Sequence, residues 1–155
     1  MKKLLYLLLI SLIVISCDKS ENCCTIVDTH VDIRFVDANE DNILDQTNGI
    51  ESSKITIFNK VENSWIEYSE GNLDYSKGYM VYERDNENYL RLFPNGDITS
   101  NNLSETKIQY SNFEPDVVKS QIDLSNGNMI CTKLWLNGVM IWEGNESERI
   151  IQIEK

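Results

Sequence analysis

Histidine is the scarcest chemically versatile residue in this 155-residue chain, with His30 as its single copy. The sequence also lacks a Gly-x-Ser-x-Gly elbow, a His-Glu-x-x-His pair, a phosphate-cradling glycine loop and a Cys-x-x-Cys pair. Those motifs position the nucleophiles, metals and phosphates of large enzyme classes. Their absence, together with a lone histidine, argues against catalysis.

Basic residues are also few. The chain has 14 Lys and Arg against 25 Asp and Glu, and removing residues 1–16, which hold two of the lysines, leaves 12 against 25, a net charge of −13. Contacts to nucleic-acid phosphates and to anionic lipid surfaces depend on Lys and Arg. The sequence therefore predicts no nucleic-acid partner.

No hydrophobic run is long enough to cross a membrane as a helix. The apolar stretch Leu4–Ile15 follows Lys2 and Lys3 and is much shorter than the roughly 20 residues that a spanning helix needs. A positively charged N-terminal region, a short apolar run and a small residue before the cleavage site are typical of a secretory signal peptide. The stretch Val14-Ile15-Ser16-Cys17 resembles the lipobox of bacterial lipoproteins.

The resemblance implies that the Cys17 thiol carries a diacylglycerol, that the bond before Cys17 is cut, and that the new N-terminus is acylated. Stable anchoring takes more than one acyl chain, because a single chain gives only marginal membrane binding. The alternative is an ordinary cleaved signal that leaves Cys17 unmodified. We therefore expect a signal peptide over 1–16, a lipidated cysteine and polar tether over 17–24, and one domain over 25–155.

The expected location is the cell envelope, where the membrane is the first partner through the N-terminal lipid. Asp18 directly after the anchor resembles an inner-membrane retention signal in some Gram-negative bacteria, and a cell-surface export signal in others. We favour the outer membrane over the inner membrane, with the cell surface as an alternative.

Period-two alternation of apolar and polar residues predicts ten short strands and no helix after residue 24. Asn137-Gly138, between two of these strands, is the strongest sequence signal for a two-residue hairpin turn. The sequence predicts an all-β fold, a single antiparallel β-sandwich of immunoglobulin-like or transthyretin-like form. The predicted strands cover 25–37, 54–60, 64–68, 78–84, 88–93, 105–110, 116–124, 129–136, 139–144 and 149–155.

In layout the chain resembles a loose group of small Gram-negative lipoproteins of unknown function. The resemblance rests on Cys17, on the segment VDANEDNILD and on the closing hairpin LWLNGVMIW. It implies a location and a β fold, and it implies no activity.

The segment from Asp37 to Asp45 is a candidate calcium loop. Asp37, Asn39, Asp41 and Asp45 could supply oxygens to a structural calcium ion, since oxygens at positions one, three and five can wrap a hard cation. Asn42 replaces the glycine at the sharp turn, so the loop is not an EF-hand. The alternative is a loop whose side chains cap their own backbone.

The C-terminal hairpin is a candidate ligand platform. With Asn137-Gly138 as the turn, Leu134 should face Ile141, and Trp135, Met140 and Trp142 should share the opposite side with Lys133. An exposed face of this kind would suit a glycan or a peptide. The alternative is that the two tryptophans are covered by a loop.

Two further groups bear on function. His30 lies between Asp28 and Asp32 on one strand face, which is typical of a charged surface facing solvent. The alternative is a metal site or an acid–base pair formed by the histidine and a carboxylate. Cys24 and Cys131 could form a disulfide outside the cytoplasm, or the thiols could remain free.

These patterns predict a lipid-anchored cell-envelope protein with a non-catalytic binding or scaffolding β-domain and a protein or glycan partner. The alternatives are a carboxylate-based glycoside hydrolase and a purely structural envelope lipoprotein.

Overall fold

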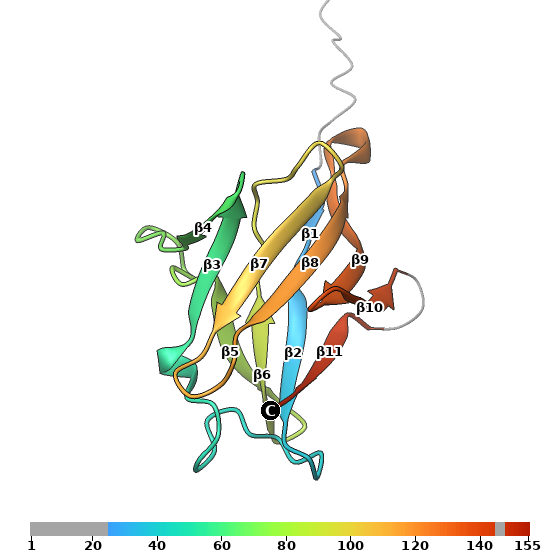
Figure 1. Ribbon diagram of the computed structural model, residues 1–155. Coiled ribbons are helices and arrows are strands. Elements are labelled where there is room, and N and C mark those ends of the chain that lie inside the picture. Colours follow the sequence, from blue (N-terminus) through green and yellow to red (C-terminus); the bar gives the residue numbers. More distant parts are fainter. Residues whose placement is uncertain (1–24, 145–147) are drawn as a thin grey trace, which may run out of the picture.

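The computed structural model describes residues 25–144 and 148–155, which fold into eleven strands and two short 3-10 turns (Figure 1). The turns are η1 (Ser52–Lys54) and η2 (Ser125–Gly127). The strands are β1 (Val27–Asp28), β2 (Val31–Val36), β3 (Thr56–Val61), β4 (Ser64–Glu67), β5 (Tyr79–Arg84), β6 (Glu87–Leu92), β7 (Leu103–Gln109), β8 (Asp116–Asp123), β9 (Met129–Leu136), β10 (Val139–Glu143) and β11 (Ile150–Glu154).

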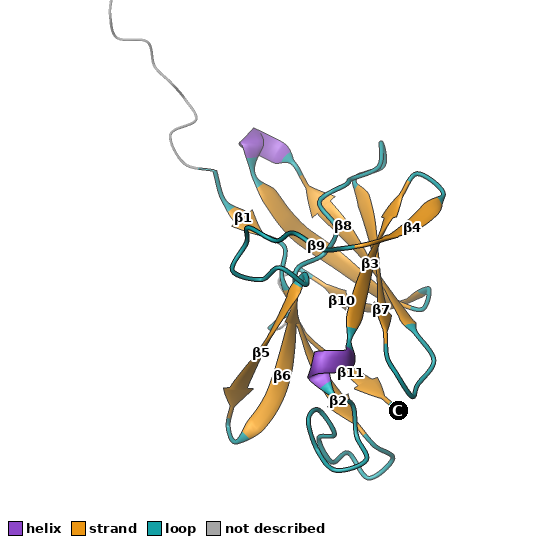
Figure 2. Ribbon diagram, turned by 90° about the vertical axis from the view of Figure 1, so that its left-hand side faces the viewer, coloured by secondary structure: helices purple, strands orange, loops and turns teal. Residues whose placement is uncertain are grey.

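The strands form two sheets. A seven-stranded sheet has the order β1-β9-β8-β7-β3-β4, with β10 also paired to β9, and a four-stranded sheet has the order β11-β2-β6-β5. Figure 2 shows β5, β6 and β2 on one side of the molecule and β3, β7 and β8 on the other. The predicted all-β sandwich is confirmed. Each sheet also contains one parallel pair, β1 with β9 and β11 with β2, which joins segments far apart in the sequence.

The first predicted strand, 25–37, is divided between the two sheets. Val27 belongs to the seven-stranded sheet and is 66% exposed, whereas Val31 belongs to the four-stranded sheet and is fully buried. The break at Thr29 and His30 moves the chain from one sheet to the other. The prediction of one continuous strand over 25–37 was therefore wrong, because alternation along a sequence cannot show a change of sheet.

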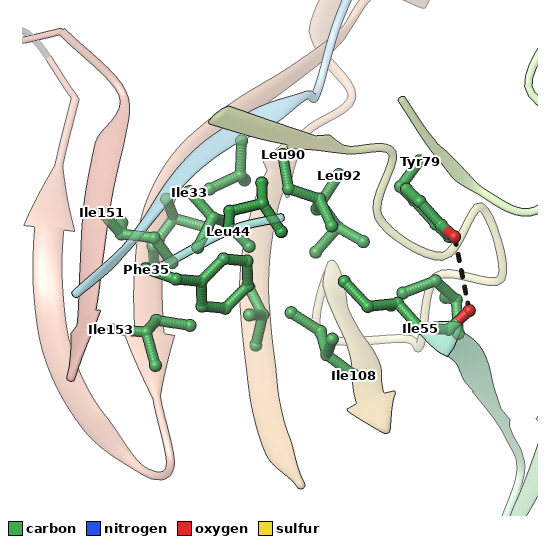
Figure 3. Packing of buried hydrophobic residues seen from close by; sticks show 14 of the residues in the cluster. Ile33, Phe35, Leu44, Ile55, Tyr79, Leu90, Leu92, Ile108, Ile151 and Ile153 are labelled. Atoms are coloured by element: carbon green, nitrogen blue, oxygen red, sulfur yellow. Dashed lines mark hydrogen bonds between the residues drawn. The ribbon is translucent and has the colours of Figure 1, made fainter. Parts of the chain in front are cut away.

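One hydrophobic core lies between the sheets (Figure 3). Ile33 and Phe35 of β2 and Leu90 of β6 are fully buried, and they meet Ile57 and Ile108 from the other sheet. Each buried side chain of this size contributes roughly 1.5 to 3 kcal/mol relative to an exposed one. The Tyr79 hydroxyl donates hydrogen bonds to the carbonyls of Ser52 and Ile55 at the edge of this core, so its polar atom is satisfied.

Polar side chains occupy another part of the interior, where the segment after β6 reaches the inner face of β7. Asn95 is only 3% exposed; its backbone N–H donates to Thr106 Oγ1 over 2.8 Å, and its carbonyl accepts from Ser104 Oγ over 2.8 Å. The Asn95 side chain donates to the Lys60 carbonyl over 2.8 Å. These bonds supply the partners that buried polar groups require, and they fix the segment after β6 against the inner face of the seven-stranded sheet.

The predicted hairpin turn between β9 and β10 is present. Asn137 and Gly138 both have positive φ, 50° and 87°, as a two-residue turn of this type requires. The Asn137 side chain also donates to Asp116 and accepts from the Val117 N–H. The turn is thereby attached to β8.

Candidate functional site

The predicted platform on the C-terminal hairpin is only partly present. Leu136 pairs with Val139 and Trp135 with Met140, as the turn geometry predicts, but the register then shifts between Met140 and Trp142. Trp142 pairs with Leu134 instead of Lys133. A β-bulge of one residue moves every following side chain to the other face. The predicted pairing of Leu134 with Ile141 was therefore wrong.

This bulge removes Trp142 from the platform. Trp142 is 9% exposed and belongs to the hydrophobic core, and the guanidinium carbon of Arg149 lies 5.0 Å from its ring centre. Trp135 stays on the outer face and is half-buried, with Met140 beside it at 52% exposure. The structure thus brings Trp135 and Met140 together and sends Trp142 to the interior.

The outer face of the seven-stranded sheet contains a longer array than the predicted platform. Trp135 pairs with Lys119 of β8, which pairs with Glu105 of β7. On the other side, Trp65 of β4 pairs with Lys60 of β3, and Lys60 Nζ forms an ion pair of 2.6 Å with Glu105. We call this line of residues, which runs across the strands, the transverse row: Trp65, Lys60, Glu105, Lys119, Trp135 and Met140.

Lysine ammonium groups lie over the aromatic rings of this face. Lys119 Nζ is 4.6 Å from the centre of the Trp135 ring. Lys107 belongs to the same face of β7, and its Nζ is 4.3 Å from the Phe58 ring and 5.3 Å from the Trp65 ring. Cation–π contacts at exposed sites contribute about 0.5 to 1 kcal/mol each. They hold the ammonium groups in place without neutralising their charge.

Lys107 and Lys119 differ from nearly every other cation in the described part of the chain. All four arginines there form ion pairs with carboxylates, as do Lys54, Lys60, Lys133 and Lys155. Among the described lysines and arginines, only Lys77, Lys107 and Lys119 form no ion pair. Two of these three lie on the outer face of one sheet. In a chain with such an excess of acids, two lysines without an ion pair on one face are unusual.

Figure 1 looks onto this outer face, and no described strand crosses in front of β7 or β8. Its residues alternate with buried ones along both strands, because the inward side chains of β7 and β8 form part of the interior. The row therefore lies on a sheet face that no other described strand covers, with Trp65 at one end and Trp135 and Met140 at the other.

A second cluster of charges lies where the two sheets meet near β1. We call it the arginine network: Arg149, Asp28, Arg91 and Asp32. Arg149, just before β11, donates to both carboxylate oxygens of Asp28 over 2.8 and 3.2 Å, and to the backbone carbonyls of Asp28, His30 and Cys131. Arg91 donates to both oxygens of Asp32 over 2.8 Å each. Arg149 thus connects the beginning of β11, in the four-stranded sheet, to β1 and β9 of the other sheet.

The carboxylates of the network are held in their ionised form. The hydrogen bonds from Arg149 lower the pKa of Asp28. Burial acts to raise the pKa of Asp32, but the hydrogen bonds from Arg91 and Tyr82 outweigh it, so the pKa of Asp32 is also below its ordinary value. Asp32 is 7% exposed. The prediction that Asp32 faces solvent was wrong, because β2 carries it against Arg91 of β6.

His30 lines a cavity of about 350 Å³ with Asp28, Asp32 and the three arginines Arg84, Arg91 and Arg149. Its Nδ1 is 3.4 Å from Asp28, and burial followed by the charge of Arg91 lowers the pKa of the imidazole. Glycoside hydrolysis by paired carboxylates needs one acid with a raised pKa as the proton donor. Asp28 and Asp32 have the opposite shift, so this cavity gives no support to the hydrolase alternative.

The candidate calcium loop is organised by its own backbone. Asp37 Oδ1 accepts the backbone N–H groups of Asn39 and Asp41 over 2.8 and 3.1 Å, and these bonds lower the pKa of Asp37. Asp45 instead accepts the Ser52 N–H over 2.7 Å. Within the residues that the structure describes, no group of three or more His, Cys, Asp or Glu side chains could hold a metal ion. The structure brings Asp37, Asn39 and Asp41 together by capping, and Asp45 has a separate role.

Cys131 is buried on β9, and its Sγ is 3.6 Å from the carbonyl of Lys133. Burial raises the pKa of this thiol to about 11, which makes it a poor nucleophile near neutral pH. Cys24 and the anchor residue Cys17 lie outside the described residues. The disulfide and the lipidation therefore stay predictions.

Sequence reasoning missed Trp65, Lys60 and Lys119 as members of a site. The signal that could have revealed them was the parity of the predicted strands: Phe58 and Lys60 alternate with the core residue Ile57, and Lys107 alternates with Ile108. What parity alone could not supply was the order of the strands in the sheet, which places β3, β7 and β8 side by side.

Comparisons of the chain with protein-family models, curated proteins and solved structures found no match. None of the described residues forms a helix that could span a membrane.

Proposed function

We propose that this protein is a lipid-anchored, non-catalytic binding protein of the cell envelope, which contacts its partner through the outer face of the seven-stranded sheet. The observation that carries the binding role is the transverse row with Lys107 beside it. Two lysines without carboxylate partners lie over tryptophan and phenylalanine rings on an open face. Partly exposed aromatic groups combined with available charge are typical of binding surfaces.

The anchor rests on residues 1–17. A short apolar run that ends in Ser16-Cys17 supports cleavage and lipidation at Cys17, and two or three acyl chains would hold the domain at the membrane. The outer membrane is the proposed site. The acidic character of the rest of the chain fits a domain that is held by its lipid and not by contact with anionic headgroups.

The anchor is tested by expressing the full-length chain in a Gram-negative host with radiolabelled palmitate. We expect label in the wild-type protein and none in Cys17→Ser, while the matched variant Cys23→Ser keeps its label. Label that persists in Cys17→Ser would show that the anchor lies elsewhere or that acylation is nonspecific.

The binding face is tested by lysine footprinting on the unmodified protein. Intact envelopes and the purified protein are treated with an acetylating reagent, and each lysine is followed by mass spectrometry. We expect Lys107 and Lys119 to be protected several-fold in envelopes relative to the purified protein. Lys54 and Lys77, which are exposed on other surfaces, serve as internal controls and should react equally in both samples. Equal labelling of Lys107 and Lys119 in both samples would contradict a bound face.

A further inference from the structure

We infer that the transverse row binds an acidic polysaccharide, whose chain runs across the strands with sugar rings against the two tryptophans and acidic groups near Lys107 and Lys119. This inference rests on the proposed binding function and names the class of ligand for that face.

The length of the row indicates a polymer. Trp65 and Trp135 lie four strands apart in the sheet, and neighbouring strands are about 4.8 Å apart, which separates the two tryptophans by roughly 19 Å. A single sugar ring cannot contact both. An extended chain of several sugars can, and a sheet face that no other described strand covers leaves room for such a chain.

The chemistry of the row indicates sugars that carry acidic groups. Tryptophan rings offer flat apolar surfaces with a negative π-face, on which the C–H bonds of a sugar ring can lie. Lysine is a flexible point charge with rotatable donors, so it can follow a carboxylate without a fixed bidentate geometry. Lys107 and Lys119 lie on adjacent strands one register step apart, with Lys107 opposite Val117 and Lys119 opposite Glu105. Two cations therefore lie between the tryptophans.

The surroundings argue against a densely charged polymer. Glu105 lies in the row itself, and Glu67 and Glu143 lie on the same face at its two ends, opposite Phe58 and Lys133. The described residues as a whole carry 22 acidic side chains against 11 basic ones. A nucleic acid, with a charge on every phosphate, would meet these carboxylates and would gain too few cation contacts to offset them. A polymer with one acid per sugar or fewer avoids that repulsion.

The test measures binding of the full-length protein, purified in a non-ionic detergent, to immobilised polymers by biolayer interferometry. Polygalacturonate and alginate are the acidic polysaccharides, dextran is the neutral one, and polyglutamate and single-stranded oligo(dT) are the other polyanions. We expect binding to at least one acidic polysaccharide and weaker binding, by about tenfold or more, to the other three.

Charge variants assign the binding to the row. The double variant Lys107→Glu/Lys119→Glu should lose about tenfold or more in affinity. The matched control Lys54→Glu/Lys77→Glu makes the same change in net charge on other surfaces and should bind as wild type does. Circular dichroism and thermal melts verify that both variants are folded, and Trp135→Phe provides a milder change that keeps an aromatic ring.

Several outcomes would overturn the inference: no binding to either acidic polysaccharide, equal binding to dextran, equal or tighter binding to polyglutamate or oligo(dT), or equal losses in the two charge variants. These results are separate from the footprinting of the native protein. Protection of Lys107 and Lys119 in envelopes without polysaccharide binding would keep the binding face and reject this class of ligand.

Discussion

Trp135 and Trp142 lie on the same hairpin, and each has a cation over its ring, yet they belong to two different kinds of site. The guanidinium over Trp142 belongs to Arg149, which is occupied by a carboxylate and three backbone carbonyls. The ammonium over Trp135 belongs to Lys119, which has no carboxylate partner among the described residues. A cation over a tryptophan ring thus forms part of the architecture in one place and has no carboxylate partner among the described residues in the other.

The difference comes from burial and from the number of acceptors. The Arg149 side chain is 12% exposed, so its charge must be satisfied within the protein. Lys119 lies on a face open to water, where solvent can satisfy the ammonium group and a ligand can later replace that solvent. An unpaired cation is therefore informative only on an open surface, whereas a buried cation held by a carboxylate and backbone carbonyls indicates a structural role.

The largest expected effect separates the two tryptophans. Trp142→Ala should reduce the free energy of unfolding by about 3 to 5 kcal/mol, because it removes a large buried ring from the core. Trp135→Ala should cost only about 1 kcal/mol, as a half-buried surface change does. Urea titrations followed by far-UV circular dichroism give both values, and Trp142→Phe should recover part of the loss. Equal costs for the two alanine variants would mean that both tryptophans are core residues.

The next effect separates the two kinds of cation. Arg149→Ala should cost about 2 to 4 kcal/mol, since it leaves Asp28 and three backbone carbonyls without their donor. Lys119→Ala and the exposed-pair variant Arg84→Ala should each cost less than about 1 kcal/mol. The same urea titrations measure all three. A loss in Lys119→Ala as large as that in Arg149→Ala would show that the row supports the fold and is not free for a ligand.

The smallest effect concerns pH. The pKa of Asp32 is lower in the folded protein than in the unfolded chain, so the folded state binds fewer protons at this site. The stabilisation from the Asp32–Arg91 pair is therefore complete above about pH 5 and is lost as the pH falls below about 4.

Asp32→Asn should lower stability at neutral pH by about 1 to 3 kcal/mol and flatten the fall in stability on the acid side. The measurement is the free energy of unfolding of both proteins from about pH 3 to about pH 7. Glu51→Gln, which alters the exposed ion pair with Lys54, is the comparison and should leave the acid limb almost unchanged. An unchanged limb in Asp32→Asn would mean that Asp32 does not contribute to acid sensitivity.

Most strands of this fold could be read from the sequence because they bury the side chains of one face. Alternation located β3 and β7, for example, since Ile57 and Ile108 alternate with polar neighbours. The turn at Asn137-Gly138 was predicted because few other dipeptides accept two positive φ angles. The candidate site was predicted only in part, through Trp135 and Met140. Trp142 was predicted on the wrong face because the sequence pattern of the hairpin does not reveal the β-bulge between Met140 and Trp142.

The sequence by itself determined the all-β class, the positions of most strands and the closing hairpin, because these depend on short local patterns. The anchor at Cys17 stays a prediction. Only the tertiary structure decided which strands are neighbours. It split β1 from β2, moved Trp142 into the core and aligned Trp65, Lys60, Lys119 and Trp135 across the sheet. The physical reason is that strand order and register are set by packing two sheets over a common core, which no single segment can specify.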